Sequence, residues 1–300
     1  MSHVSVLLQP SIDALNLAKG MTVVDGTYGG GGHSRAIAKV IGKSGRLIAF
    51  DADAAVFADE KTKEIEALTK FTRVTENFRT MKAVLTRLEV AEIDGALFDL
   101  GLSSTQLEAS GRGFSFQKDE PLLMTFKKAP SEDDVTTKVI VNTWKPETIA
   151  TVLQGFGDER YGWRIAEGIV AARKIGEITT TFQLVEIIKQ STPTGYHHGK
   201  THFATRTFQA LRMAVNDELG AIEKGIEGAF AKLKVGGRIA VISFHSIEDR
   251  LVKQLCKKHV EEGSAKAIFK KPLTPDDDEL MVNPRARSAK LRVIEKISEP

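Results

Sequence analysis

The sequence predicts an α/β protein with a mostly parallel sheet and a helical domain inserted after the fourth strand. Short apolar runs alternate with helical patterns over the first hundred residues, and a glycine-rich turn follows the first run. The strand signals then stop at about residue 106 and resume after residue 205. We therefore expect a discontinuous domain, 1–105 with 206–300, interrupted by a helical domain at 106–205.

The first hundred residues justify the parallel sheet. The expected strands are Met21–Asp25, Arg46–Phe50, Thr72–Thr75 and Ile93–Leu100, and the expected helices are about Ser34–Ile41, about Ala54–Leu68 and one following Asn77. Strands that alternate with helices require right-handed crossovers, and such crossovers connect parallel strands.

The helices and strands of the insertion and of the second half of the chain are predicted from the same apolar patterns. The insertion contains helical stretches such as ERYGWRIAEGIVAARK and TFQLVEIIKQ. After it we expect one long helix, a strand, a second helix and a last edge strand, at Thr207–Leu233, Arg238–Phe244, Ile247–His259 and Ser288–Ile297.

Composition predicts a soluble enzyme of a reducing compartment. The 300 residues are 42% hydrophobic and carry a net charge of +3, which permits a nucleic-acid partner without requiring one. The single cysteine, Cys256, excludes an internal disulfide, and its apolar surroundings predict a packed thiol rather than a nucleophile. The start of the sequence does not resemble a signal peptide, and no apolar run approaches the roughly 20 residues of a membrane span. We expect a cytoplasmic protein without a membrane partner.

The stretch VVDGTYGGGGHSRAIA, residues 23–38, predicts a ligand site. Glycines after a parallel strand let a ligand approach the backbone closely. Asp25 at the start of the turn would repel a pyrophosphate but could pair with the ammonium group of an amino acid. Asp51 and Asp53 follow the second strand, where a carboxylate suits ribose hydroxyls. S-adenosylmethionine is thus favoured as the ligand, while a dinucleotide remains the alternative. The turn is not a Walker phosphate loop, because His33-Ser34 stands where that loop has a lysine and a hydroxyl residue.

Two further positions are candidates for catalysis. Asp99 ends the fourth strand beside the glycine turn, where its carboxylate could contact cofactor or substrate. His245 follows the fifth strand at the same edge and could orient the substrate, act as a base or cap the next helix. Ser246 with Asp249 has the spacing of a capping box.

Long motifs spread along the chain resemble one bacterial family. They are HVSVLLQP, DGTYGGGGHS, FDADA, ENF, FDLGLSSTQLE, GRGFSF, HFATRTFQALRMAVNDEL, GGRIAVISFHSIEDRLVK and NPRARSAKLR. Together they resemble the RsmH (MraW) family of 16S ribosomal RNA cytosine-N4 methyltransferases. The resemblance implies a Rossmann-like class I methyltransferase fold, S-adenosyl-L-methionine as cofactor and a cytidine in the decoding region of 16S rRNA, within the small ribosomal subunit, as target. A homodimer is compatible with it.

The resemblance also implies cofactor contacts, one by one. Gly31, Gly32 and His33 match the glycine-turn contacts, Asp53 the residue near the ribose, Phe78 the aromatic by the adenine, and Asp99 and Gln106 further contacts. In one segment the chain departs from the family. Where the family reads close to PLDMRMD, this chain has PLLMTFKK, so that Leu123 replaces an acid and Thr125 an arginine.

Basic side chains favour an RNA substrate. Arg206 and Arg212 lie on the helix that returns from the insertion, and Arg285, Arg287, Lys290 and Arg292 gather in the tail. A cytosine amine is reached only in an unstacked base, and phosphate contacts would supply most of the affinity. Tyr161, Trp163 and Phe203 could stack bases, although aromatics at helical spacing are more often core residues.

Three alternatives stay open at this point. The same fold could methylate DNA or protein; the changed PLLMTF segment could belong to a non-catalytic RNA-binding module; and a dinucleotide oxidoreductase would share the glycine turn. We find no metal-ligand pattern in the sequence.

Overall fold

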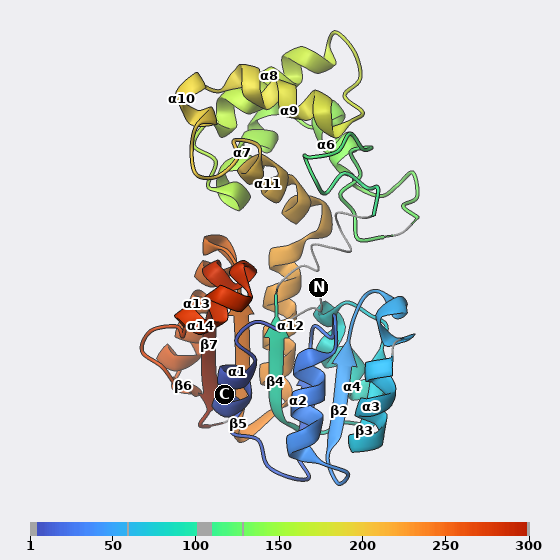
Figure 1. Cartoon of the computed structure of the whole chain (residues 1–300), viewed down its shortest axis with the longest axis vertical. Coiled ribbons are helices and arrows are strands. Elements are labelled where there is room, and N and C mark those ends of the chain that lie inside the picture. The colour runs from blue at the N-terminus through green and yellow to red at the C-terminus, as the bar shows by residue number, and fades with distance from the viewer. Residues whose placement is uncertain (1–4, 59, 101–109, 128, 299–300) are drawn as a thin grey trace. The chain divides into compact units, whose positions relative to one another are not determined.

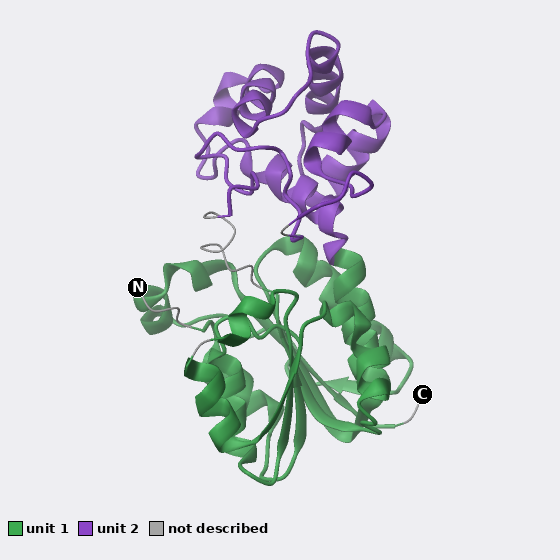
Figure 2. Cartoon of the chain, turned by 90° about the vertical axis from the view of Figure 1, so that its right-hand side faces the viewer, with its two compact units in different colours: residues 1–101, 219–300 green, residues 102–218 purple. Residues whose placement is uncertain are grey.

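A computed structural model describes residues 5–58, 60–100, 110–127 and 129–298. Its contacts divide the chain into two compact units (Figure 2): unit 1 comprises Met1–Gly101 with Leu219–Pro300, and unit 2 comprises Leu102–Glu218. Unit 2 begins 4 residues before the predicted insertion, 106–205, and ends 13 residues after it. The second difference arises because helix α11 (Thr205–Asn216) packs with α7 (Pro146–Gly157) in unit 2.

Unit 1 is built on a seven-stranded sheet in the order β3-β2-β1-β4-β5-β7-β6. The strands are β1 (Thr22–Asp25), β2 (Arg46–Phe50), β3 (Lys70–Val74), β4 (Ile93–Asp99), β5 (Leu233–Ser243), β6 (Ala265–Ala267) and β7 (Lys290–Lys296). The first five are parallel to one another, and β7 is antiparallel to both β5 and β6. The predicted α/β fold with a mostly parallel sheet is confirmed.

Helices cover both faces of this sheet, which explains why its strands read as continuous apolar runs. One face packs against α1, α2 and α3, and the other against α4, α12 and α13 (Figure 1). The helices of unit 1 are α1 (Leu8–Leu15), α2 (Gly32–Ile41), α3 (Glu60–Leu68), α4 (Met81–Arg87), α12 (Glu218–Lys232), α13 (Ser246–Glu261) and α14 (Asp277–Val282), with short 3-10 turns at Ala54–Ala58, Phe78–Thr80 and Pro284–Ser288. Cys256 packs against the second face, and burial raises the pKa of its thiol to about 11.

Unit 2 has a core of its own, formed by helices. They are α6 (Thr137–Thr143), α7, α8 (Gly162–Arg173), α9 (Thr181–Ser191), α10 (Thr194–His197) and α11. Ile140, Leu153, Ile165, Leu184 and Leu211, one from each of the longer helices, are fully buried together. In the described part of the unit the apolar residues follow helical periodicity, as the sequence predicts.

The prediction of one helix over Thr207–Leu233 is wrong. The chain forms α11 and then α12, and the break is at Asp217, whose backbone is left-handed with φ of 47°. Asp tolerates this conformation better than most residues, because its short polar side chain bonds locally. Neither glycine nor proline marks the break, so the helical periodicity conceals it.

The end of the sheet also differs from the prediction. β7 was expected at an edge, but it lies between β5 and the short strand β6, which forms the edge. A three-residue strand with the sequence AKA carries no recognisable strand signal. The third strand begins at Lys70 rather than Thr72.

Asn216, the last residue of α11, holds the segment in which the chain departs from the family pattern. Its Oδ1 accepts the N–H of Phe126 at 2.8 Å, and its Nδ2 donates to the carbonyl of Met124 at 2.8 Å. Arg112 donates to the carbonyl of Thr125 at 2.8 Å. Thr125 is buried, so this segment is a fixed turn of unit 2.

We expect Asn216→Ala to destabilise the protein by about 1–3 kcal/mol, because it leaves partly buried backbone groups of residues 124 and 126 without their partners. Urea unfolding followed by circular dichroism measures the loss. Thr143→Ala is the matched control, since its exposed hydroxyl bonds only to the carbonyl of Val139 in the same helix. Equal stability of the two variants would show that the Asn216 contacts contribute nothing.

No helix within the described ranges is long and apolar enough to cross a membrane.

Candidate functional site

The candidate site lies at the carboxyl edge of the sheet, where β1 and β4 end side by side. β1 pairs with β4 in parallel, so Asp25 and Asp99, their last residues, reach the same edge. The glycine turn connects β1 to α2 at this edge, and the loop after β2 adjoins it. This is the position at which open α/β sheets bind their ligands.

Asp25 organises the glycine turn from beneath. Its Oδ1 accepts the N–H of Thr27 at 3.0 Å, and its Oδ2 accepts the hydroxyl of Ser34 at 2.6 Å. The side chain is completely buried, and this burial raises the pKa of the carboxyl to about 6. The structure thus gives Asp25 a role in holding the turn, while its predicted contact with an ammonium group stays a prediction.

Asp51 ties the glycine turn to the loop after β2. Its Oδ2 accepts the N–H of Gly29 at 2.9 Å, and its Oδ1 accepts the N–H of Asp53 at 2.9 Å. Burial raises the pKa of the Asp51 carboxyl above its ordinary value. Because both Asp51 oxygens bind backbone, Asp53 is the better placed of the two for a ribose; its Oδ1 also accepts the N–H of Ala55 at 3.0 Å.

The sequence reasoning missed the structural partners of these acids, Thr27 and Ser34. A signal for Thr27 was present, because an Asp commonly accepts a hydrogen bond from the backbone two residues later. Ser34 is fully buried, and its bond to Asp25 spans the whole turn, so only the folded turn reveals it.

Gly31, Gly32 and His33 form the start of α2. Gly31 has φ of 70°, a left-handed conformation that favours glycine. The Nε2 of His33 lies 3.1 Å from the carbonyl oxygen of Val6, and since a carbonyl can only accept, Nε2 carries the proton. The Nδ1 of His33 lies 3.6 Å from Oδ2 of Asp99, so this histidine connects the segment before α1 to the end of β4.

Asp99 is attached to the same turn through its backbone. Its N–H donates to Oγ1 of Thr27 at 2.6 Å. The side chain keeps 17% of its surface exposed, in contrast to fully buried Asp25. Of the acids at the ends of β1 and β4, Asp99 is therefore the more accessible.

Phe78 lies in the turn after β3, half-buried against the core. Its ring packs edge-on against Phe98, with centroids 5.6 Å apart. On its other side α12 approaches closely at Gly225, where an added Cβ would lie 2.5 Å from the Phe78 ring. Phe78 is thus held by packing from two elements.

These residues fit an adenosyl amino acid as ligand. The buried carboxylate of Asp25 and the half-buried carboxylate of Asp51 both bind the glycine turn, which disfavours a pyrophosphate there. The half-buried carboxylate of Asp53 suits the hydroxyls of a ribose, and the fixed ring of Phe78 suits an adenine. The partly exposed carboxylate of Asp99 suits a cationic group. Gln106 lies outside the described residues.

His245 caps helix α13. Its Nδ1 accepts the N–H of Glu248 at 3.3 Å, and its Nε2 lies 3.0 Å from Oε1 of the same residue. The predicted capping box of Ser246 with Asp249 is wrong, because the helix begins one residue earlier than that spacing assumes. Asp249 instead binds Lys290 and Arg292, at 3.0 and 2.7 Å.

The predicted RNA-binding residues fall into two groups. Arg206, Arg285 and Arg287 are exposed, although Arg206 also donates to the carbonyl of Asp158 at 2.8 Å. Arg212 and Lys290 are bound within the protein, to Glu218 at 2.8 Å and to Asp249. The exposed group is the better candidate for phosphate contacts.

Among residues 5–58, 60–100, 110–127 and 129–298, no cluster of three His, Cys, Asp or Glu side chains could hold a metal.

The sheet order and the glycine turn at its carboxyl edge define a Rossmann-like class I methyltransferase. The chain belongs to the MraW methylase family, whose model matches residues 1–297. Its cofactor is S-adenosyl-L-methionine, in agreement with the prediction.

A curated relative supports the family over the whole length. The chain is 40% identical over 316 residues to the "Ribosomal RNA small subunit methyltransferase H" of Paenibacillus sp. (strain JDR-2), which covers 98% of this chain and 99% of the relative.

Solved structures are also similar. An rRNA methylase from Streptococcus thermophilus matches at 12% identity with a TM-score of 0.46, covering 99% of this chain and 100% of that one. A SAM-dependent O-methyltransferase from Thermotoga maritima matches at 10% identity with a TM-score of 0.43, covering 100% of this chain and 69% of that one.

The buried carboxyl of Asp25 predicts a pH dependence of stability. Its pKa is about 6 in the folded protein against 3.8 ordinarily, so the folded state binds the proton more tightly. Its contribution is therefore fully present below about pH 4 and is lost as the pH rises through about 6. We expect the melting temperature of the cofactor-free protein to fall over this range relative to that of Asp25→Asn. If the difference in melting temperature between the two proteins does not change with pH, the raised pKa of Asp25 is contradicted.

The close approach of α12 predicts the effect of Gly225→Ala. The added methyl must displace the ring of Phe78, and we expect the affinity for S-adenosylmethionine to fall about tenfold, equal to about 1.4 kcal/mol. Isothermal titration calorimetry measures it. Gly155→Ala in α7 is the control, because its Cβ would enter open space. Equal affinities of Gly225→Ala and the unmodified protein for S-adenosylmethionine would refute a contact of Phe78 with the cofactor.

Proposed function

We propose that this methylase transfers a methyl group from S-adenosyl-L-methionine to the N4 amino group of a cytidine in the decoding region of 16S rRNA, in the small ribosomal subunit. The observation that carries the proposal is the 40% identity, over 98% of the chain, to a relative named for methylation of small-subunit ribosomal RNA. The motifs around the glycine turn and at the end of β4 support the cytosine amine as target by resemblance. The substrate implies a cytoplasmic protein.

When bound, the cofactor supplies a methyl group on a sulfonium, which an amine displaces in line. The N4 amine of cytosine is a poor nucleophile, since its lone pair is delocalised into the ring. A carboxylate that accepts a hydrogen bond from this amine favours a more tetrahedral nitrogen and stabilises the developing positive charge. Asp99 is the proposed acceptor, because it ends β4 at the ligand edge and keeps part of its surface exposed.

His33 is the proposed positioning residue for this carboxylate. Its ring is 5% exposed, with Nε2 3.1 Å from the carbonyl oxygen of Val6 and Nδ1 3.6 Å from Oδ2 of Asp99. Both oxygens are acceptors, so the ring attracts both when each of its nitrogens carries a proton. The backbone bond from Asp99 to Thr27 fixes the same carboxylate relative to the glycine turn. Asp99 can take up the proton that the methylated amine releases, or pass it to water. His245 is a weaker candidate for this task, because both its ring nitrogens face Glu248.

We expect Asp99→Ala to lower methyl transfer by roughly 10²–10³-fold without loss of fold, because it removes the acceptor for the amine. The assay uses labelled S-adenosylmethionine and small subunits that lack native methylation, with digested nucleosides compared to N4-methylcytidine. Asp133→Ala, at an exposed acid of unit 2, is the control.

Label in another nucleoside would refute the cytosine target, and label in protein would support the alternative substrate class. Full activity of Asp99→Ala would refute the role of Asp99.

A further inference from the structure

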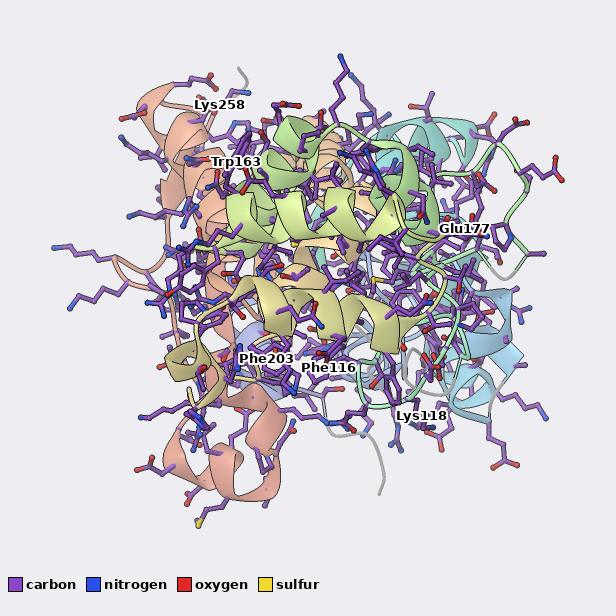
Figure 3. All side chains as sticks on the ribbon, turned by 90° about the horizontal axis from the view of Figure 1, so that it is seen from above. Phe116, Lys118, Trp163, Glu177, Phe203 and Lys258 are labelled. Carbon is purple, nitrogen blue, oxygen red and sulfur yellow. The ribbon has the colours of Figure 1, made fainter. Side chains whose placement is uncertain are left out.

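Unit 2 carries a stack of three aromatic rings. The imidazole of His202 lies between the phenyl rings of Phe116 and Phe203, with centroid distances of 4.4 and 4.3 Å. The interplanar angles are 7° and 28°, so the three rings are close to parallel. Phe116 comes from the segment before α6, and His202 and Phe203 directly precede α11. Both phenylalanines are labelled in Figure 3, where they lie next to one another.

The outer rings of the stack are anchored. Phe116 packs edge-on against buried Phe208, with centroids 5.5 Å apart. Phe203 packs against His197 at 4.8 Å, and Nε2 of His197 lies 2.9 Å from the hydroxyl of Thr192. Both phenylalanines are half-buried, so neither can turn freely.

The middle ring, in contrast, is exposed to solvent. The Nδ1 of His202 accepts the N–H of Ala204 at 3.3 Å, a long hydrogen bond within its own turn. Burial, with the nearby His197, lowers the pKa of His202, which favours the neutral ring. A neutral, planar, exposed ring between two fixed phenyl rings occupies the place of a stacked base in aromatic RNA-binding sites.

The surroundings favour a ligand with phosphates. Lys118 follows Phe116 by two positions, Lys200 precedes His202 by two, and both are exposed. Figure 3 labels Phe203, Phe116 and Lys118. Exposed lysines two residues from the stacked rings in the sequence suit the phosphates that flank a nucleotide.

We propose that Phe116 and Phe203 form a clamp for one unpaired nucleobase of the RNA substrate, and that His202 fills this clamp until the base displaces it. The identity of the ligand as RNA rests on the proposed function. In the free protein, the His202 ring covers one face of each phenyl ring. When a larger aromatic base replaces His202, the stacking on both phenyl rings is retained. The clamp accepts any base, since stacking on aromatic rings tolerates sequence.

Binding of a short fluorescein-labelled oligouridylate to the full chain, followed by anisotropy, tests the clamp. We expect Phe116→Ala and Phe203→Leu each to weaken binding about tenfold, whereas His202→Ala binds at least as tightly as the unmodified protein. Phe182→Ala is the matched control: it removes another phenylalanine of unit 2, which lies on α9 and is 49% exposed, and should change nothing. Melting temperatures exclude unfolding, and Phe203→Leu keeps an apolar side chain in place.

A second readout reports the displacement itself. In protein with ¹³C-labelled histidine, the two phenyl rings shift the ring signal of His202, which the spectrum of His202→Gln identifies among the 7 histidines. Addition of oligouridylate should move this signal to the position of a free histidine. An unmoved signal with bound RNA would overturn the displacement.

The remaining outcomes separate the clamp from the proposed function. Native affinity in both phenylalanine variants, no measurable binding by the unmodified protein, or a loss in His202→Ala equal to theirs would overturn the clamp. Methyl transfer to small subunits by the unmodified protein is measured in parallel. Clamp-dependent binding without methyl transfer would overturn the proposed function alone, and methyl transfer without clamp dependence would overturn the clamp alone.

Discussion

The glycine turn depends on two carboxylates, the buried one of Asp25 and the half-buried one of Asp51, which accept hydrogen bonds from groups of the turn itself. Asp25 holds the turn from the end of β1 and Asp51 holds it from the end of β2. A run of four glycines has large conformational freedom when unfolded, and hydrogen bonds to charged acceptors are among the stronger ones available to order it. Thr27 extends this arrangement to β4 through the backbone of Asp99. Three strand ends are thereby placed relative to one another before any ligand arrives.

This arrangement divides the acids of the site by exposure. Asp25 is inaccessible and Asp51 is occupied by N–H groups, whereas Asp99 keeps an accessible surface beside a nearly buried histidine. Desolvation destabilises the charged forms of Asp25 and Asp51 and so raises the pKa of both carboxyls. The hydrogen bonds that they accept offset this effect only in part. The proposed chemistry therefore rests on Asp99, while the two other carboxylates give the turn its shape.

Sequence reasoning reached the architecture and the edge of the sheet because both follow from local periodicity and strand ends. The apolar runs 21–25, 46–50 and 93–100 and the glycine turn predicted where β1, β2, β4 and α2 lie. The break at Asp217 and the edge strand β6 depend on tertiary contacts or on three-residue signals, and periodicity cannot reveal them. The cap at His245 was among the sequence-based alternatives. The stack around His202 was missed because Phe116 lies far from His202 and Phe203 in the sequence. Family resemblance, not geometry, distinguished Asp53 from Asp51.

The position of β7 has a consequence for the order in which the protein forms during synthesis. Unit 2 is continuous in sequence, so all of its helices have been translated once residue 218 is reached. The sheet of unit 1 is different: β5 obtains its second neighbour, and β6 its only strand partner, when residues 290–296 are added. Until then one side of β5 offers unpaired backbone groups to other chains. A nascent chain at that stage therefore contains the whole sequence of the helical unit but an incomplete sheet, and this is the stage at which edge-to-edge pairing between chains is favoured.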